Sequence, residues 1–185
     1  MKLTASKREE KTKGENNKIR REGHIPAVLY GVKQENQNIF VDGPQYHAAI
    51  RSMKQGGLST MVFELEVEGK KVKAIVKQVQ YHPTTYDVMH LDFLALDDKV
   101  EVCLKVPIRI VGKGDCIGVK EGGVLRQIIR AIKVKCLPSD IPEEFFLPVQ
   151  DIKMMGSKAL DKLEFPKGVK PMARLSEVVA IVAKR

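Results

Sequence analysis

Residues 61–76 read MVFELEVEGKKVKAIV. From Met61 to Val67, every second side chain is apolar and most of the others are glutamates, which is typical of a strand with one buried face. The segment EGK at 68–70 supplies a turn, and the alternation resumes from Val72 to Val76. We therefore predict a β-hairpin over residues 59–79. The phase of the alternation slips near Lys77–Val79, which predicts a bulge there.

The segments around this hairpin predict more short strands and a helix. Residues 25–31 (IPAVLYG), 38–42 (NIFVD) and 90–94 (HLDFL) are typical of strands. Pro44 favours the first turn of a helix, and Gly56 and Gly57 are expected to end it. Residues 13–17 (KGENN) have no hydrophobic periodicity. They predict a loop that orders on binding, or a loop with a helical turn.

The second half of the chain predicts a separate, all-β domain. The polar segment LDDK at 96–99 is the best boundary, which gives domains at 1–95 and 96–185. Residues 100–110 form a long alternating strand, in which Pro107 on the opposite face favours an edge position or a bulge. Residues 125–132 fit a helix or a strand, and their Ile and Val content favours the strand. Residues 178–183 predict a terminal buried strand. The chain is thus expected to be mainly β.

The net charge of +9 is concentrated in two short stretches. Residues 1–21 carry eight Lys and Arg against three Glu, and residues 109–135 carry seven against two acids. Concentrated positive charge indicates a polyanionic partner, usually a nucleic acid, although a solvated face that aids solubility has the same pattern. A membrane surface is disfavoured, because residues 7–21 offer only Ile19 as an apolar side chain.

The composition excludes several other classes. Hydrophobic residues at 43% provide a globular core, and no apolar run approaches the ~20 residues that span a bilayer. Residues 1–20 are too polar for a secretory signal. Three widely spaced cysteines, Cys103, Cys116 and Cys136, argue against a disulfide framework and fit a reducing compartment. With no Trp and 5% aromatic residues, stacking is not expected to be the main binding device.

Catalysis and metal binding have weak support. His82, His90 and Asp92 on two neighbouring strands can supply a base with an orienting carboxylate, but no nucleophile and no phosphate-binding loop accompany them. No Cys-x-x-Cys pair is present, so we predict no metal and no cofactor. On the residues alone, both histidines are better explained as satisfied structural groups. An enzyme that uses these three residues remains the alternative from a different class.

Nucleic-acid binding has a physical basis in the first domain. The basic residues of segment 1–21 can pair with phosphates, and arginine can also contact guanine edges. Asn16 and Asn17 can read base edges or 2′-hydroxyls. Tyr30 ends a strand just past this segment, where it either contacts RNA or serves as a core residue with its hydroxyl at the surface.

Several sequence blocks are similar to the signature blocks of one family. They are 25–31 (IPAVLYG), 79–83 (VQYHP) and 90–93 (HLDF) in the first half. In the second half they are 106–107 (VP), 118–123 (GVKEGG) and 136–142 (CLPSDIP). In this order and spacing they resemble the bacterial large-subunit ribosomal protein family numbered twenty-five, in its long, two-domain general stress protein (Ctc-type) form. The resemblance covers essentially the whole chain.

This resemblance implies a structural, non-catalytic protein of the large ribosomal subunit. It implies an N-terminal small β-barrel with short helices, similar to the anticodon-binding barrel of glutaminyl-tRNA synthetase, followed by a β-rich C-terminal domain. The barrel is expected to bind 5S rRNA on the minor-groove side of an internal loop rich in non-Watson–Crick pairs, where unusual base edges are accessible. The RNA-facing positions that it implies are Arg8, Lys13, Asn16, Lys18, Arg20, Tyr30, Gln80, His82, His90 and Asp92.

One segment departs from the family pattern. Relatives are usually more basic where this chain has Glu15, Asn16 and Asn17, and Glu15 is expected to weaken phosphate binding. Besides 5S rRNA, we expect neighbouring rRNA and proteins of the subunit as partners, a cytoplasmic ribosomal location, and a monomer off the ribosome. No membrane or small-molecule substrate is expected. The alternative is a stress-induced factor that visits ribosomes conditionally.

Overall fold

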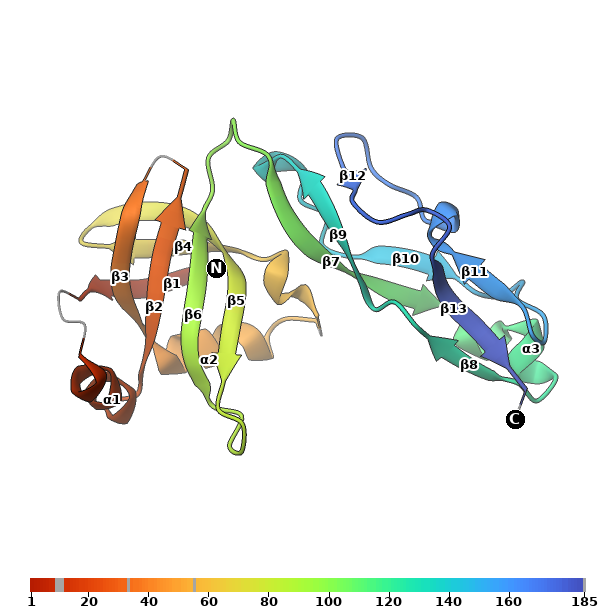
Figure 1. Ribbon diagram of the computed structural model, residues 1–185, viewed down its shortest axis with the longest axis horizontal. Coiled ribbons are helices and arrows are strands. Elements are labelled where there is room, and N and C mark those ends of the chain that lie inside the picture. Colours follow the sequence, from red (N-terminus) through yellow and green to blue (C-terminus); the bar gives the residue numbers. More distant parts are fainter. Residues whose placement is uncertain (9–11, 33, 55, 185) are drawn as a thin grey trace. The chain divides into compact units, whose positions relative to one another are not determined.

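The computed structural model describes residues 1–8, 12–32, 34–54 and 56–184. It divides into two compact units, unit 1 at Met1–Val100 and unit 2 at Glu101–Arg185 (Figure 1). Each unit is built mainly from strands, so the predicted fold class is confirmed.

Unit 1 is a closed six-stranded barrel with the strand order β1-β3-β2-β6-β5-β4. β1 closes it, because this strand pairs with β4 in parallel and with β3 in antiparallel orientation. Closure leaves no free sheet edge in the barrel. The strands are β1 (Lys2–Lys7), β2 (His24–Gly31), β3 (Gln34–Asp42), β4 (Val62–Val67), β5 (Lys70–Tyr81) and β6 (Val88–Ala95).

The predicted hairpin is confirmed as β4 and β5. Its two turn residues, Glu68 and Gly69, both have positive φ (49° and 79°), which is the conformation of a tight hairpin turn. The predicted bulge is also present, since the register between β5 and β6 shifts between Val76 and Gln78. Alternation along the hairpin therefore places one face of each strand inside the barrel.

The barrel interior is apolar. Phe63 of β4 and Phe93 of β6 are fully buried and meet edge to face, with ring centroids 6.1 Å apart. The predicted helix is confirmed as α2 (Gly43–Arg51), which buries Tyr46 and Ala49. It ends earlier than predicted, and Gly56 instead precedes a short 3₁₀ turn, η1 (Gly57–Ser59).

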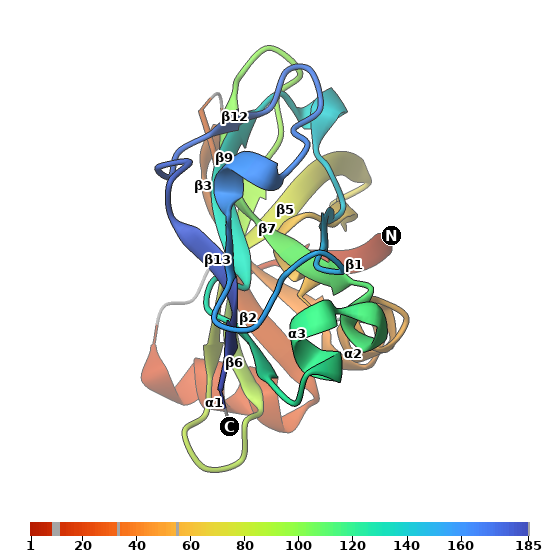
Figure 2. The ribbon, with the colours of Figure 1, turned by 90° about the vertical axis from the view of Figure 1, so that its right-hand side faces the viewer.

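The N-terminal segment was predicted incorrectly. Residues 13–17 belong to a nine-residue helix, α1 (Lys13–Arg21), and not to a loop. The strand β1 was not predicted either, because only Leu3 and Ala5 are buried in it. Figures 1 and 2 both place α1 near the end of the barrel where the turn between β5 and β6 lies.

Unit 2 contains a four-stranded sheet, β10-β7-β9-β12, and a three-stranded sheet, β11-β13-β8. The ambiguous segment 125–132 lies in β8, a bend and β9, so the strand interpretation is confirmed there. A single helical turn, α3 (Ile117–Lys120), interrupts the predicted all-β pattern, as do the 3₁₀ turns η2 (Lys113–Asp115), η3 (Pro138–Asp140) and η4 (Leu160–Lys162). The strands are β7 (Val102–Val111), β8 (Val124–Gln127), β9 (Ala131–Cys136), β10 (Phe145–Pro148), β11 (Ser157–Ala159), β12 (Lys170–Pro171) and β13 (Val178–Ala183).

The expected edge position of Pro107 is wrong, because β7 lies between β9 and β10. The backbone N of Ile108 donates to Arg130 O in the direction of β9, at 2.9 Å. By strand alternation, the ring nitrogen of Pro107 faces the other side, where β10 begins to pair only at Ile108. An inner strand thus accommodates proline at a position where no ladder donor is needed.

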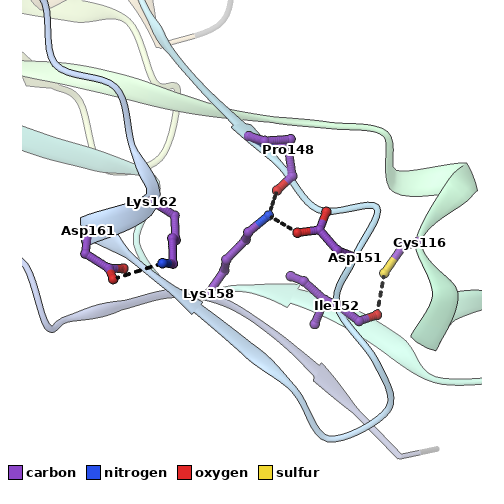
Figure 3. A network of polar contacts seen from close by, with 7 residues as sticks. All are labelled: Cys116, Pro148, Asp151, Ile152, Lys158, Asp161 and Lys162. Carbon is purple, nitrogen blue, oxygen red and sulfur yellow. Dashed lines mark hydrogen bonds and ion pairs between the residues drawn. The ribbon is translucent and has the colours of Figure 1, made fainter.

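A polar network fixes the loop between β10 and β11 (Figure 3). The ammonium of Lys158 donates to Pro148 O at 2.6 Å and to Asp151 Oδ2 at 3.0 Å. Cys116 donates its thiol to Ile152 O at 3.4 Å. The largely buried side chain of Lys158 thus joins β11 to the loop that follows β10, and the Cys116 thiol joins that loop to the distant segment before α3.

Candidate nucleic-acid interface

Helix α1 begins with a capping box. Thr12 Oγ1 accepts from the backbone N of Glu15 at 3.5 Å, and Glu15 Oε2 accepts from the backbone N of Thr12 at 3.0 Å. These two bonds satisfy donors that a helix start leaves open. Glu15, which we expected to weaken phosphate binding, therefore stabilises the helix that carries the basic residues Lys18, Arg20 and Arg21 in its last turn.

Two arginines are held by asparagines of this helix. Arg8 Nη1 donates to Asn16 Oδ1, and Arg20 Nη1 donates to Asn17 Oδ1 at 3.0 Å. Arg20 also donates from Nε and Nη2 to the carbonyl of Met89 in β6, both at 3.2 Å. This clamp ties α1 to the barrel. Asn16 and Asn17 thus position arginine side chains, besides any contact that they make with RNA.

The two guanidinium groups lie close enough to influence each other. Burial lowers the pKa of Arg8, and the charge of Arg20 lowers it further. Arg8 remains cationic, because the pKa of a guanidinium ordinarily lies far above neutral pH. Its buried Nε has no hydrogen-bond partner among the described residues. A pair of neighbouring cations with an unsatisfied donor is a favourable place for an anion.

The outer surface of β6 carries a second polar group. Leu91 and Phe93 are fully buried in the barrel, so alternation places His90 and Asp92 on the outside. His90 Nδ1 and Asp92 Oδ1 are 2.9 Å apart and form a hydrogen-bonded pair. A carboxylate in this position fixes the orientation of the imidazole, because it holds one ring nitrogen and leaves Nε2 for another partner.

Neighbouring strands extend this polar surface. In β5, Gln80 lies opposite His90 and Gln78 lies opposite Asp92. In β2, Tyr30 lies opposite Leu94, and the pKa of its phenol is raised by burial and by the nearby charge of Asp92. Tyr30 is half-buried, which fits a ring against the barrel with its hydroxyl at the surface.

His82 does not join this group. Its Nδ1 accepts from the backbone N of Thr84 at 3.4 Å and of Thr85 at 3.3 Å, in the turn between β5 and β6. Only His90 and Asp92 of the alternative catalytic set are therefore in contact. Within the described ranges, no group of three His, Cys, Asp or Glu side chains is placed to hold a metal ion.

A pocket of about 990 Å³ lies where α1, α2 and the turn between β5 and β6 meet. Arg20, His82 and Met89 line it, together with His47 and Arg51 of α2. His82 and Arg20 therefore line the same pocket. Lys18 is exposed on α1, whereas the side chain of Lys13 lies outside the described part of the structure.

Most residues of this candidate interface were named from the sequence, but the helix and the hydrogen bonds that hold them in place were not predicted. Thr12-x-x-Glu15 is a capping-box signature that predicts a helix from residue 13. That helix would have placed Asn17 and Arg20, three residues apart, on one face. No sequence signal indicates the Met89 carbonyl as an acceptor, because a backbone group has no residue preference.

Comparisons with known proteins show the family of this chain. The model of the Ribosomal L25p family matches residues 3–93, and that of the ribosomal protein TL5 C-terminal domain matches residues 101–185. Proteins named large ribosomal subunit protein bL25 align over 185 residues, 100% of this chain and of each relative. They are 44% identical in Chlamydia trachomatis serovar L2, 42% in Chlamydia muridarum and 41% in Chlamydia pneumoniae.

Two further findings bear on the class of protein. No helix in the described ranges is long and apolar enough to cross a membrane. The matching family models and the full-length relatives are all ribosomal proteins, which settles the choice between a ribosomal protein and an enzyme. This chain belongs to the Ribosomal L25p family, in the form that carries a TL5 C-terminal domain, and is a structural ribosomal protein without catalytic activity.

Proposed function

We propose that this protein binds 5S rRNA within the large ribosomal subunit, and that residues 1–95 form the binding domain. The observation that carries the proposal is the clamp of Arg20 onto the Met89 carbonyl of β6. It joins the basic helix α1 to the strand that presents His90 and Asp92. Cations that attract RNA and polar groups that read it thereby belong to one rigid surface.

The proposed mechanism has two parts. Arg8, Arg20 and Lys18 attract the phosphate backbone and set the orientation of the RNA. The fixed pair of His90 and Asp92 then reads groups in the widened groove of an internal loop, where an ionised carboxylate accepts only from donors such as an exocyclic amine or a 2′-hydroxyl. The proposed RNA-facing set is Arg8, Lys13, Asn16, Lys18, Arg20, Tyr30, Gln80, His82, His90 and Asp92.

A titration of the full chain against 5S rRNA, with tRNA as competitor and at two salt concentrations, tests this proposal. Arg20→Ala should weaken binding to both RNAs and reduce the salt slope by about one. His90→Ala should weaken binding to 5S rRNA by about tenfold or more and leave tRNA binding unchanged. Asn36→Ala, at an exposed position of β3 outside the candidate interface, is the control. Equal effects of Arg20→Ala and His90→Ala on both RNAs would refute the division into positioning and reading contacts.

We also propose that the protein is monomeric off the ribosome. The closed barrel of unit 1 offers no strand edge to a second copy, and the edge strands of the two sheets in unit 2 are only two to four residues long. Light scattering on the RNA-free protein measures this directly. A concentration-independent mass of one chain is the expected result, and a stable dimer contradicts it.

A further inference from the structure

The exposed face of the four-stranded sheet in unit 2 places two lysines directly opposite each other. Lys105 of β7 and Lys133 of β9 are register partners, and both side chains point to solvent. Because Ile108 N donates to Arg130 O, alternation makes Lys105 and Lys133 a non-hydrogen-bonded pair, whose side chains lie closer than in the other type. Their ammonium groups therefore repel each other.

The acidic side chain on this face forms ion pairs with lysines other than Lys105 and Lys133. Glu101 pairs with Lys135 at 2.7 Å and with Lys170 at 3.6 Å. The hydrogen bond from Lys135 lowers the pKa of Glu101, which keeps this carboxylate ionised and engaged. Among the described residues, neither Lys105 nor Lys133 has an ion-pair partner. Positive charge on this face is thus left uncompensated.

The surroundings of these lysines are suited to a nucleic-acid backbone. Glu144 accepts from Arg109 Nε at 2.6 Å, which holds that guanidinium in place on β7. Phe146 lies opposite Arg109 on β10 and is 55% exposed. An exposed aromatic ring beside a fixed guanidinium can contact a ribose or an unpaired base at the margin of the face.

We propose that the lysine face of unit 2, formed by Lys105, Lys133, Lys135 and Lys170, binds the phosphate backbone of an RNA duplex without reading its sequence. Like charges directly opposite on a sheet destabilise it, so the pair of Lys105 and Lys133 has no structural benefit. A phosphate between the two ammonium groups converts this repulsion into two attractions. Lysine ammoniums act as flexible point charges, which favours contacts with phosphates over contacts with base edges.

The test uses the full chain and a base-paired RNA duplex that has no internal loop. In the double variant Lys105→Gln/Lys133→Gln, the slope of log affinity against log salt should fall by about two, since each phosphate contact contributes ~0.9. Between about 50 and 200 mM salt, the loss of affinity should consequently become roughly tenfold smaller. The control Lys113→Gln/Lys153→Gln removes the same charge from exposed positions outside this sheet and should change the slope by much less.

Further measurements separate this proposal from its rivals. Arg20 lies in unit 1. In an Arg20→Ala background, the double variant Lys105→Gln/Lys133→Gln should therefore still lower the salt slope of duplex binding by about two. Lys133→Glu should raise the melting temperature by forming a cross-strand ion pair with Lys105, and should weaken duplex binding at the same time. If the control variant lowers the salt slope as much as the double variant, general charge explains the binding and the proposal fails. Competition by polyglutamate as strong as by RNA would instead indicate an acidic protein partner and would also overturn it.

Discussion

The two units of this protein present positive charge in different ways. In unit 1, Arg8 and Arg20 are each held by an asparagine of α1, and Arg20 is also fixed to a backbone carbonyl of the barrel. In unit 2, Lys105 and Lys133 lie opposite each other on the neighbouring strands β7 and β9. Neither has an ion-pair partner among the described residues. Both units have a basic stretch with the same surplus of cations in the sequence. Charge counts therefore do not distinguish cations that are held in a fixed direction from cations on freely rotating side chains.

The difference lies in how many degrees of freedom each cation retains. A guanidinium with two or three fixed hydrogen bonds has a defined direction and can set the orientation of a bound RNA. A lysine ammonium at the end of four rotatable bonds contributes affinity that any polyanion can use. We therefore expect variants of His90 and Asp92 in unit 1 to change selectivity among RNAs, whereas variants of Lys105 and Lys133 in unit 2 should change salt dependence alone.

The largest expected effect comes from the barrel core. Phe93 is fully buried against Phe63, so Phe93→Ala should destabilise unit 1 by about 3–5 kcal/mol. Hydrogen exchange measured by mass spectrometry should show faster exchange in residues 1–100 and little change in residues 101–184. Val32→Ala, at a position 74% exposed, is the control. Equal acceleration in both units would show that they do not unfold independently.

Asp92→Asn should have the next largest effect, which is a loss of selective binding to 5S rRNA. Loss of the charge that orients His90 should reduce affinity for 5S rRNA by about ten- to a hundredfold, or ~1–3 kcal/mol, and spare tRNA binding. The same variant should lower the raised pKa of Tyr30, since Asp92 is its second cause after burial. NMR titration of the tyrosine rings measures this pKa. An unchanged value would show that Asp92 does not act on Tyr30.

A smaller effect is expected at the start of α1. Thr12→Ala removes the cap that faces Glu15 and should cost about 1 kcal/mol of helix stability. Amides of residues 14–21 should exchange faster, and affinity for both RNAs should fall modestly, because Asn16 and Asn17 no longer hold their arginines as firmly. Thr12→Ser keeps the hydroxyl and should behave like the parent protein. A full effect in Thr12→Ser would argue against the cap.

The smallest effect concerns unit 2 and depends on pH. The hydrogen bond from Lys158 lowers the pKa of Asp151 below its ordinary value of 3.8. The stability that ionised Asp151 gives to folded unit 2 is fully present above that ordinary value, and it is lost as pH falls through the lowered pKa. Asp151→Asn should therefore flatten the acid side of the stability profile of unit 2, as followed by thermal unfolding below pH 4. Asp161→Asn, in an exposed pair with Lys162, is the matched control, and an equal flattening there would contradict the prediction.

Elements whose signals are local could be predicted from the residues alone. The alternation in 61–76, the EGK turn and the bulge near Lys77 were all predicted correctly, because side-chain period and turn chemistry are properties of adjacent residues. The family was also evident from short blocks in a fixed order. The charge stretches indicated a polyanion without showing how their side chains are held.

How these elements are joined depends on contacts between distant segments of the folded chain. β1 has just two buried apolar side chains and becomes a strand because β3 and β4 supply its hydrogen-bond partners from distant parts of the chain. Pro107 occupies an inner strand because β10 begins to pair one residue later. The clamp of Arg20 on the Met89 carbonyl and the opposition of Lys105 to Lys133 depend on register between segments far apart in sequence. Such pairings follow from the closure and packing of the sheets, and the residues involved carry no local signal for them.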